Sequence, residues 1–468
     1  MKRMAKVLVF FVVVLFPFKA GAGGRVTFDQ VMDKVLHNSF DVKIAEKDIH
    51  ISEASRKETV SLYYPTLKGK WNSEYIKDLT GGGGDLTSVG NSVFGEPTSY
   101  RNSYSLNAEW LLYDFGAREN RMTFAQKDIK ARSAAHSQCI RDVRLEALRI
   151  YTELLLISRE LEVRKTLLGF QRDLVSASQR LQQAGMLLKV DMVDDMLNTI
   201  KTLNAMEALK GDLKKALHEL SVLTRERYNS ETIEIEGFPE IDTGPESFPV
   251  ERAPEYRIYD LEIEKKQNEL AVLKKDWLPR LDFYSGYIWY GKDASVYAHS
   301  IENVKEQNYI VGIAATISFF SGFKTRGQIE KVNLEIEKLK LEKDKKIAEL
   351  TTKYQTTGET LTTLAEEITS RKEMIHNATE KLSMTERLMA EKVAGQKEFL
   401  NQKMELATEQ WELHRAEIKI KSAGIQLILL STGQINGNCS CLPGTDRQSQ
   451  PDKPGFTNPE KRFRNFWR

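Results

Sequence analysis

The sequence predicts a mainly α-helical chain that also carries membrane-type β-strands, and three observations lead to this fold class. Two long stretches without proline repeat hydrophobic residues at coiled-coil spacing, which predicts two very long helices. Two pairs of segments alternate apolar and polar residues, which predicts two β-hairpins. The same order of elements occurs twice along the 468 residues, so the chain is built as an internal duplication.

The composition excludes several classes of protein. A formal net charge of +2 is too small to favour nucleic-acid binding, so no nucleic-acid partner is expected. The 3 cysteines are too few for a disulfide scaffold, and after the N-terminus no apolar run is long enough for a transmembrane helix. The histidines are scattered, and no Ser/His/Asp or Cys/His signature stands out. The sequence therefore predicts no enzyme, no cofactor and no bound metal.

Residues 1–22 have the pattern of a secretory signal peptide. A basic start at residues 2–6 precedes an unbroken apolar run at 7–16, and the small residues from Ala20 to Ala22 suit cleavage. The mature protein is therefore expected to work outside the cytoplasm.

The first repeat covers residues 23–225. It is expected to hold a helix from Phe28 to Tyr64, a β-hairpin at about 64–114, a long helix, a tip near 185–191 and a return helix. Apolar residues alternate along one strand of the hairpin: Tyr104, Leu106, Ala108, Trp110 and Leu112. Period-two alternation suits a transmembrane strand, and it also suits a half-buried strand of a soluble protein.

The second repeat covers residues 254–433 and has the same order, with a β-hairpin at about 279–321 and a tip near 395–398. Its alternating face consists of Tyr309, Val311, Ile313, Ala315, Ile317 and Phe319. Three residues of the first copy recur in order in the second: Pro65 as Pro279, Gly116 as Gly322 and Gly185 as Gly395. Agreement at several points in one order favours duplication over coincidence.

The long helices are expected from Ala117 to Ala184 and from Phe323 to Ala394. The first of them carries a heptad stripe: Ile140, Val143, Ala147, Ile150, Leu154, Ile157 and Leu161. At 1.5 Å per residue each helix would reach ~100 Å. A shorter helix before each hairpin and a return helix after each tip would stack end to end beside it, which predicts a tall coiled-coil wall.

Two segments lie outside the repeats. Residues 226–253 are acidic, link the two halves and are expected to pack around the waist of the helical wall. Residues 434–468 are predicted to be a disordered tail, although their basic and aromatic end could touch anionic lipid or a partner.

Three local features are interpreted as structural. The glycine run Gly81–Gly84 is not followed by Gly-Lys-Ser/Thr, so an exposed loop is favoured over a phosphate cradle. His136 and Cys139 share a helix face, but no third metal ligand is apparent. Cys439 and Cys441 could pair with each other only with strain, so another disulfide and free thiols both stay open.

The four predicted strands imply association. Four strands cannot close a barrel with a lumen, and open sheet edges cannot face lipid. Three copies would supply twelve strands, enough for a wide channel, so a homotrimer is expected.

This ordered and duplicated set resembles the TolC-like outer-membrane efflux proteins. The resemblance covers roughly Thr27 to Gly433. Its carrying segments are two strand-to-helix turns, one helix-to-strand junction and two tips: Leu112–Arg118, Ser321–Gly327, Trp277–Pro279, Ala184–Asp191 and Val393–Leu400.

The resemblance implies an outer-membrane location with a periplasmic extension. It implies a trimeric twelve-stranded β-barrel in outer-membrane lipid, which continues into a long α-helical periplasmic tunnel. It also implies two kinds of partner, a periplasmic adaptor protein and an inner-membrane pump. The chain would then be the passive exit channel of an efflux or type I secretion system.

The resemblance also assigns roles to particular residues. It places Asp191, Lys397, Glu398 and Asn401 at a periplasmic aperture, where threefold symmetry would make carboxylate rings and Lys397 would form an ion pair with a neighbouring helix. It assigns contact with the adaptor to residues at the tips, and it places glycines and prolines at the strand–helix turns. These residues are Gly185, Leu188 and Gly395 for the tips, and Gly116, Gly322, Pro65 and Pro279 for the turns.

A second hypothesis is a periplasmic coiled-coil structural or adaptor protein without a barrel. The two matched hairpins argue against it, because such a protein has no need of amphipathic strands with aromatic faces.

Overall fold

The computed structural model describes residues 25–77, 98–240, 248–293, 295–393 and 395–432, except the side chains of Ile76, Thr98, Ser99 and Thr432. All of them belong to one compact unit, residues 1–433. The predicted signal peptide and the C-terminal tail lie outside the described residues, as do Gly81–Gly84, Cys439 and Cys441.

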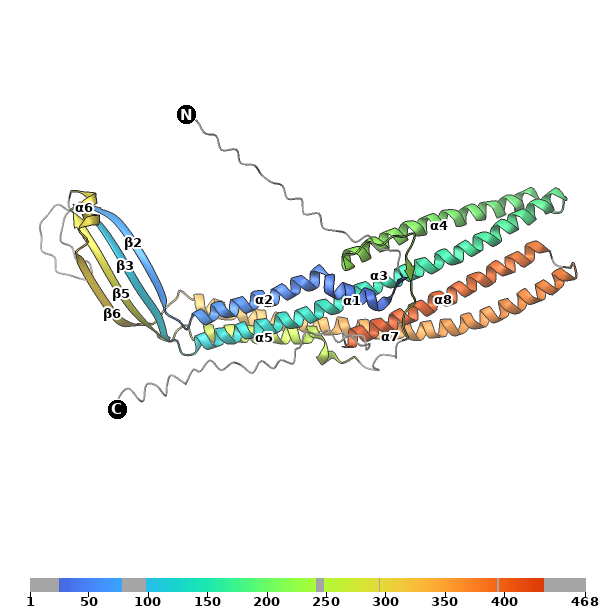
Figure 1. The fold of residues 1–468 in the computed structure, drawn as a ribbon. Helices are drawn as coiled ribbons and strands as arrows, with labels where there is room; N and C mark the ends of the chain where they lie inside the picture. The colour runs from blue at the N-terminus through green and yellow to red at the C-terminus, as the bar shows by residue number, and fades with distance from the viewer. Residues whose placement is uncertain (1–24, 78–97, 241–247, 294, 394, 433–468) are drawn as a thin grey trace, which may run out of the picture. The chain divides into compact units, whose positions relative to one another are not determined.

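The described chain contains two similar sets of elements, each with a helix, two strands, a long helix and a return helix in the same order, and each with one further helix (Figure 1). The first copy consists of α1 (Phe28–Asn38), α2 (Phe40–Ser61), β2 (Thr66–Lys77), β3 (Thr98–Tyr113), α3 (Ala117–Gln183) and α4 (Lys189–Thr224). The second copy consists of α5 (Pro254–Leu273), β5 (Arg280–Asp293), α6 (Tyr297–Glu302), β6 (Glu306–Thr316), α7 (Lys324–Ala390) and α8 (Gln396–Thr432). Between and before them lie β1 (Arg25–Val26), β4 (Glu234–Ile235) and the short helix η1 (Val250–Arg252).

The helix expected from Phe28 to Tyr64 is divided at Ser39, which corrects the prediction. Ser39 has φ −54° and ψ 135°, so it leaves the helical region, and its hydroxyl caps α2 by accepting from the amide of Asp41 at 3.2 Å. The break lets α1 turn its buried face, including Phe28 and Val35, into the core.

The strands form one antiparallel sheet in the order β2-β3-β5-β6, at one end of the helices (Figure 1). Residues paired across the strands share a face, so Tyr104 lies beside both Trp71 and Trp289. Because β6 ends at Thr316, the expected strand residues Ile317 and Phe319 lie beyond the sheet.

One face of the sheet is mainly aromatic and apolar, and the other is mainly polar, although it also carries Ile288 and Ile310. The apolar face includes Leu67, Trp71, Tyr104, Leu106, Trp110, Phe283, Tyr309, Val311 and Ile313. The opposite face includes Lys70, Ser103, Ser105, Asn107, Asp282 and Asn308. Leu67 is 71% exposed and Ile313 is 66% exposed, so a single chain leaves the apolar face open.

The helices pack as two antiparallel hairpins, α3 with α4 and α7 with α8, whose tips lie opposite the sheet (Figure 1). Toward the sheet, α2 packs on α3, and α5 packs between α3 and α7. Helix α8 also contacts α3, which joins the two hairpins. The interior of this packing is leucine-rich, as heptad spacing predicts, with Leu154, Leu220 and Leu429 almost completely buried.

An aromatic cluster holds the linker to the middle of α3. Phe28, Tyr151 and Phe238 pack ring to ring at 5.3 to 5.5 Å between centroids. The Tyr151 hydroxyl lies within hydrogen-bonding distance of two backbone carbonyls, those of Glu236 at 2.7 Å and Val26 at 3.2 Å. Edge-to-face aromatic packing stabilises this region, which we call the waist.

The waist also contains a buried ion pair that joins α3 to the start of α5, ten residues along α3 from Tyr151. Arg141 and Glu255 form a two-pronged pair, with one bond of 2.8 Å, and their side chains are only 4% and 3% exposed. Burial alone would raise the pKa of Glu255, but the hydrogen bonds and charge of Arg141 outweigh burial and lower that pKa. Removing only one partner of such a pair destabilises the folded state, because the other charge stays buried without compensation.

The left-handed backbone positions mark the ends of both long helices. Phe115 and Gly116 precede α3, and Gly322 with Phe323 precedes α7, all with positive φ. At the first tip Gly185 has φ 72°, as glycine allows at a helix end.

The second tip differs from the prediction, because Lys392, not Gly395, takes the left-handed conformation, with φ 61°. The amide of Val393 donates to the Leu388 carbonyl at 2.8 Å, matching the bond of Met186 to Leu181 at the first tip. Since α3 and α7 both have 67 residues, the turn follows at the same position in the two copies, and in the second copy a lysine holds that position instead of a glycine.

Candidate functional site

The two tips are joined by a small polar cluster that we call the tip link, made of Ser178, Asp195 and Lys397. Ser178 on α3 is fully buried and donates to the Asp195 carboxylate on α4 at 2.6 Å. The Lys397 ammonium on α8 reaches the same carboxylate oxygen at 2.8 Å. One carboxylate therefore connects three helices and both helical hairpins.

A second bond lies close to the tip link. The Arg180 guanidinium on α3 donates to the side-chain oxygen of Gln396 on α8 at 3.1 Å. Both bonds run from the first hairpin to the first residues of α8, so they fix the second tip against the first.

The residues expected at the aperture behave differently from one another. Lys397 forms the expected ion pair with a neighbouring helix. Its partner is Asp195, a residue that the sequence alone does not single out. Among the described residues, the side chains of Asp191, Glu398 and Asn401 make no ion pair or hydrogen bond. The spacing of Asp191 and Asp195, one helical turn apart, was the available signal for Asp195.

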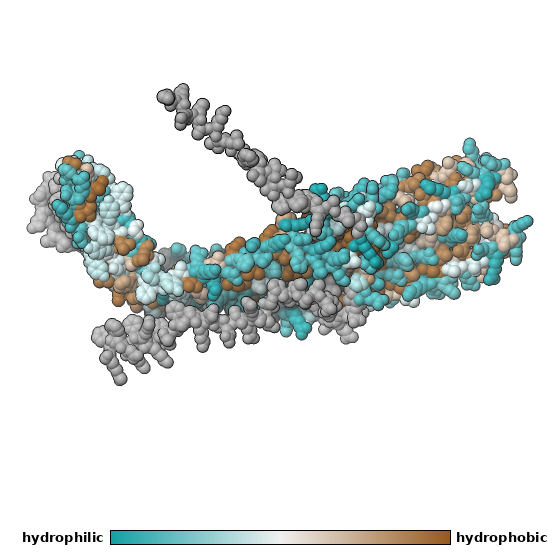
Figure 2. Space-filling model, viewed as in Figure 1, coloured by the Kyte–Doolittle hydropathy of each residue, from teal (hydrophilic) through white to brown (hydrophobic). Residues whose placement is uncertain are grey.

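The tips expose apolar side chains. Leu188 is 73% exposed and its neighbour Met186 is 76% exposed, while Val393 at the other tip is 72% exposed. Gly185 and Gly395 have open space around them, so neither is needed for close packing within the chain. Figure 2 shows hydrophobic surface continuing along the tip half of the helices.

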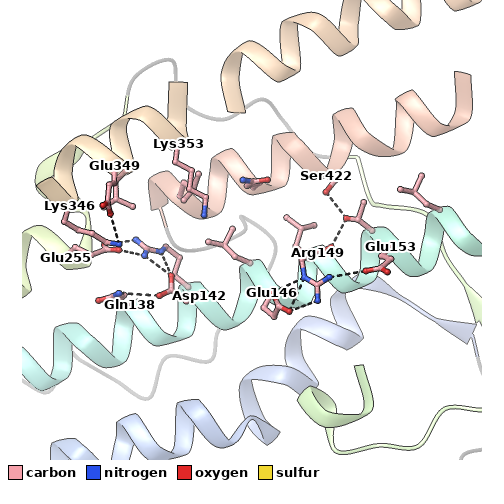
Figure 3. A pocket seen from close by; sticks show the side chains of 18 of the residues that line it. Gln138, Asp142, Glu146, Arg149, Glu153, Glu255, Lys346, Glu349, Lys353 and Ser422 are labelled. Atoms are coloured by element: carbon pink, nitrogen blue, oxygen red, sulfur yellow. Dashed lines mark hydrogen bonds and ion pairs between the residues drawn. The ribbon is translucent and has the colours of Figure 1, made fainter. Parts of the chain in front are cut away.

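A groove of about 990 Å³ lies at the waist between α3, α7 and α8 (Figure 3). Its walls carry charges of both signs that largely satisfy each other, as where Arg149 pairs with Glu146 at 2.8 Å and with Glu153 at 3.1 Å. Thr152 and Ser422 share a hydrogen bond of 2.8 Å across it. Because these polar side chains pair with one another, the groove is typical of polar packing between helices rather than of a ligand site.

The described residues contain no group of three or more His, Cys, Asp or Glu that could hold a metal ion. Cys139 is a free, half-buried thiol whose pKa is raised by burial. Within the same residues, no helix combines the length and the apolar character that crossing a membrane requires.

The family model for outer membrane efflux proteins matches residues 31–224 and 250–433. These two segments cover both structural repeats, with their strands and long helices. The chain belongs to the outer membrane efflux protein family. The predicted resemblance is therefore confirmed, and the match supports a channel rather than an adaptor without strands.

Solved structures of outer-membrane channels share the fold of this efflux protein. The channel OprN is 15% identical with a TM-score of 0.71, over 86% of this chain and 89% of that one. VceC from Vibrio cholerae is 12% identical with a TM-score of 0.70, over 86% and 95%. MtrE from Neisseria gonorrhoeae, described as an open state, is 11% identical with a TM-score of 0.66, over 86% and 88%.

A comparison with curated proteins found no sequence match. The family and the fold nevertheless agree on one class of protein. This efflux protein is an outer-membrane channel with a periplasmic extension, as its sequence predicts.

Proposed function

We propose that three copies of this chain form one continuous passive channel. The observation that carries the proposal is the four-stranded sheet, which has one apolar face and one polar face and stands on two long helical hairpins. Three sheets joined edge to edge give a closed twelve-stranded barrel with its apolar face toward lipid.

The sheet edges explain why one chain is not enough. Strands β2 and β6 each pair on one side only, so each leaves a row of backbone groups without partners in the sheet. Hydrocarbon offers no hydrogen bonds to such groups, and pairing β6 of one copy with β2 of the next satisfies them.

We propose further that the tips form the gate. The tip link holds α8 against α3 and α4, so the second hairpin is kept close to the first. Asp191, Glu398 and Asn401, which have no side-chain partner within the described chain, would line the aperture as threefold rings. Carboxylate rings favour the passage of cations.

The exposed apolar tips suit docking of a periplasmic adaptor protein. Gly185, Leu188 and Gly395 lie at these ends, and Met186 and Val393 add apolar surface. An inner-membrane pump would deliver the substrate, in an efflux or a type I secretion system, and the channel would do no chemistry.

The test uses the full-length protein, purified from membranes in mild detergent. Light scattering should give three chains per particle, and the protein should form stable conducting pores in a planar bilayer. Monomeric protein without pores would overturn the proposal.

A pair of matched variants tests the orientation of the sheet. Val311→Lys places a charge on the exposed apolar face, where it should block pore formation by costing about 2–4 kcal/mol in lipid. Ser105→Lys places the same charge on the polar face and should leave pores intact. Equal effects of the two variants would contradict the assignment of the faces.

A further inference from the structure

The duplication leaves one helix contact unmade within the chain. In the second repeat α5 packs on both long helices, α3 and α7. Its counterpart in the first repeat, α2, packs on α3 but makes no comparable contact with α7. If the repeat continues around a ring, the missing contact is between α2 of one copy and α7 of the next.

The free side of α2 carries an alternating stripe. Ile44 and Ile51 lie two helical turns apart and are 59% and 63% exposed. Asp41 and Asp48 fall on the same side, and both are exposed. Within the described chain Asp48 makes no ion pair. Figure 2 shows hydrophobic patches set among hydrophilic ones along this helix.

The free side of α7 carries a matching apolar stripe, with lysines on the edge where α2 has aspartates; on the other edge the signs are reversed, with exposed Lys47 on α2 and exposed Glu337 on α7. Leu334 and Leu341 are also two turns apart and are 59% and 71% exposed. Between and beyond them lie Lys338 and Lys345, whose side chains are 74% and 79% exposed. Among the described residues, each of these lysines makes one ion pair, of 3.6 and 4.0 Å respectively, and both lie within α7 itself.

The internal repeat supplies the register. Within the chain, Lys265 on α5 bonds to Asp128 on α3 at 2.6 Å, and Lys127 pairs with Glu264 beside it. The spacing of Pro65 and Pro279 aligns Ile51 with Lys265. The left-handed residues directly before the two long helices are Gly116 and Phe323. Matching these two residues aligns Lys127 on α3 with Leu334 on α7. Within the chain, ion pairs join α5 to α3 at this position. On the free sides of α2 and α7, the equivalent positions are held by Ile51 and Leu334.

We propose that α2 of each chain packs antiparallel against α7 of the next chain in this register. Ile44 then lies on Leu341 and Ile51 on Leu334, while Asp41 faces Lys345 and Asp48 faces Lys338. The inference rests on the proposed trimer and adds its residue pairing. The charges alternating with the apolar residues exclude a lipid-facing role for these stripes, and their opposite signs select a second copy as the occupant.

The contact would make the interface between chains differ from the interface within a chain. The internal α5–α3 contact uses Lys265, Asp128, Lys127 and Glu264. The contact between chains uses four aliphatic side chains at the equivalent level, flanked by charges that set direction and register.

The test is disulfide cross-linking in the full chain, with Cys139, Cys439 and Cys441 replaced by serine. Ile44→Cys with Leu341→Cys, and Ile51→Cys with Leu334→Cys, should each give covalent dimers and trimers under mild oxidation. The out-of-register pair, Ile44→Cys with Leu334→Cys, should give at least tenfold less. Each single cysteine variant serves as a background control.

A charge exchange provides an independent readout. Lys338→Asp should reduce cross-linking of the Ile44–Leu341 pair several-fold, because two acids then face each other. Asp48→Lys in the same chain should restore it. Cross-linking unaffected by either change would overturn the register.

The trimer and its register fail in distinguishable ways. If a general amine cross-linker still traps trimers but neither in-register cysteine pair does, the α2–α7 pairing is wrong and the channel stands. The same holds if these cysteines cross-link only to another periplasmic protein. If no reagent traps trimers, the proposed channel falls as well.

Discussion

The waist and the tips of this channel are held by different forces. The waist buries three aromatic rings and a closely matched ion pair between Arg141 and Glu255. The tips are joined by two polar bonds to the first residues of α8, in the midst of exposed apolar side chains. A long helical wall can therefore stay fixed in its middle and still separate at its end.

Removing one partner of the buried ion pair should have the largest effect on the waist. Glu255→Ala leaves Arg141 charged, buried and without its two-pronged partner, so the free energy of unfolding should fall by about 3–5 kcal/mol. Thermal unfolding followed by circular dichroism measures the change. Glu251→Ala removes an exposed carboxylate nearby and should change stability little. Similar losses in both variants would show that the pair does not hold the waist.

Acid should weaken the waist through the same pair. The folded-state pKa of Glu255 lies below its ordinary value of 4.5, so the pair stabilises the fold above about pH 4.5. That contribution is lost as the pH falls further toward the folded-state pKa. Unfolding midpoints measured from about pH 6 to about pH 3 should decline more steeply in the unmodified protein than in Glu255→Gln. Parallel curves would contradict the assignment.

A substitution at the second tip should stabilise the protein slightly. Lys392 holds a left-handed conformation that costs a side chain roughly 1 kcal/mol. Lys392→Gly should therefore slow hydrogen exchange at the ends of α7 and α8, by up to about 1 kcal/mol in local opening free energy. At the first tip, Gly185→Ala should have the opposite effect. Faster exchange in Lys392→Gly would mean that the lysine side chain has a role of its own.

Breaking the tip link should have the smallest effect on stability and a clear effect on conduction. Lys397→Met removes the bond from α8 to Asp195, so pores should open more often or conduct more. The unfolding midpoint should change by less than that of Glu255→Ala. Lys381→Met breaks an ion pair with Glu405 inside one hairpin and serves as the control. Unchanged conductance in Lys397→Met would remove the tip link from the gate.

The sequence predicts the regular parts of the fold because they follow periodic patterns. Heptad spacing determines α3 and α7, and alternation determines the faces of the strands. Ser39 escapes prediction because one serine among helix-forming residues can either cap a helix or continue it. Lys392 escapes prediction because a left-handed position is expected at a glycine, and here a lysine takes it three residues before Gly395.

The tip link is harder to predict than the fold. Ser178, Asp195 and Lys397 come from three helices, and one of them is far away in the sequence. Charge near a helix start is common without any function, so only the three-dimensional packing distinguishes Asp195 from Asp191 and Asp194. Lys397 was predicted to pair with a neighbouring helix, but its partner was not identified.

The equal lengths of α3 and α7, 67 residues each, have a consequence for whatever docks beneath the channel. Both hairpins start from the same sheet and descend by the same number of turns, so their ends stand level. Around a closed ring the docking partner would meet a flat rim on which two kinds of ridge alternate, one ending in Gly185 and the other in Lys392. Such a partner could bind all the tips in the same way, or it could bind only one of the two kinds. Gly185 and Lys392 are the residues that would let it tell the two kinds apart.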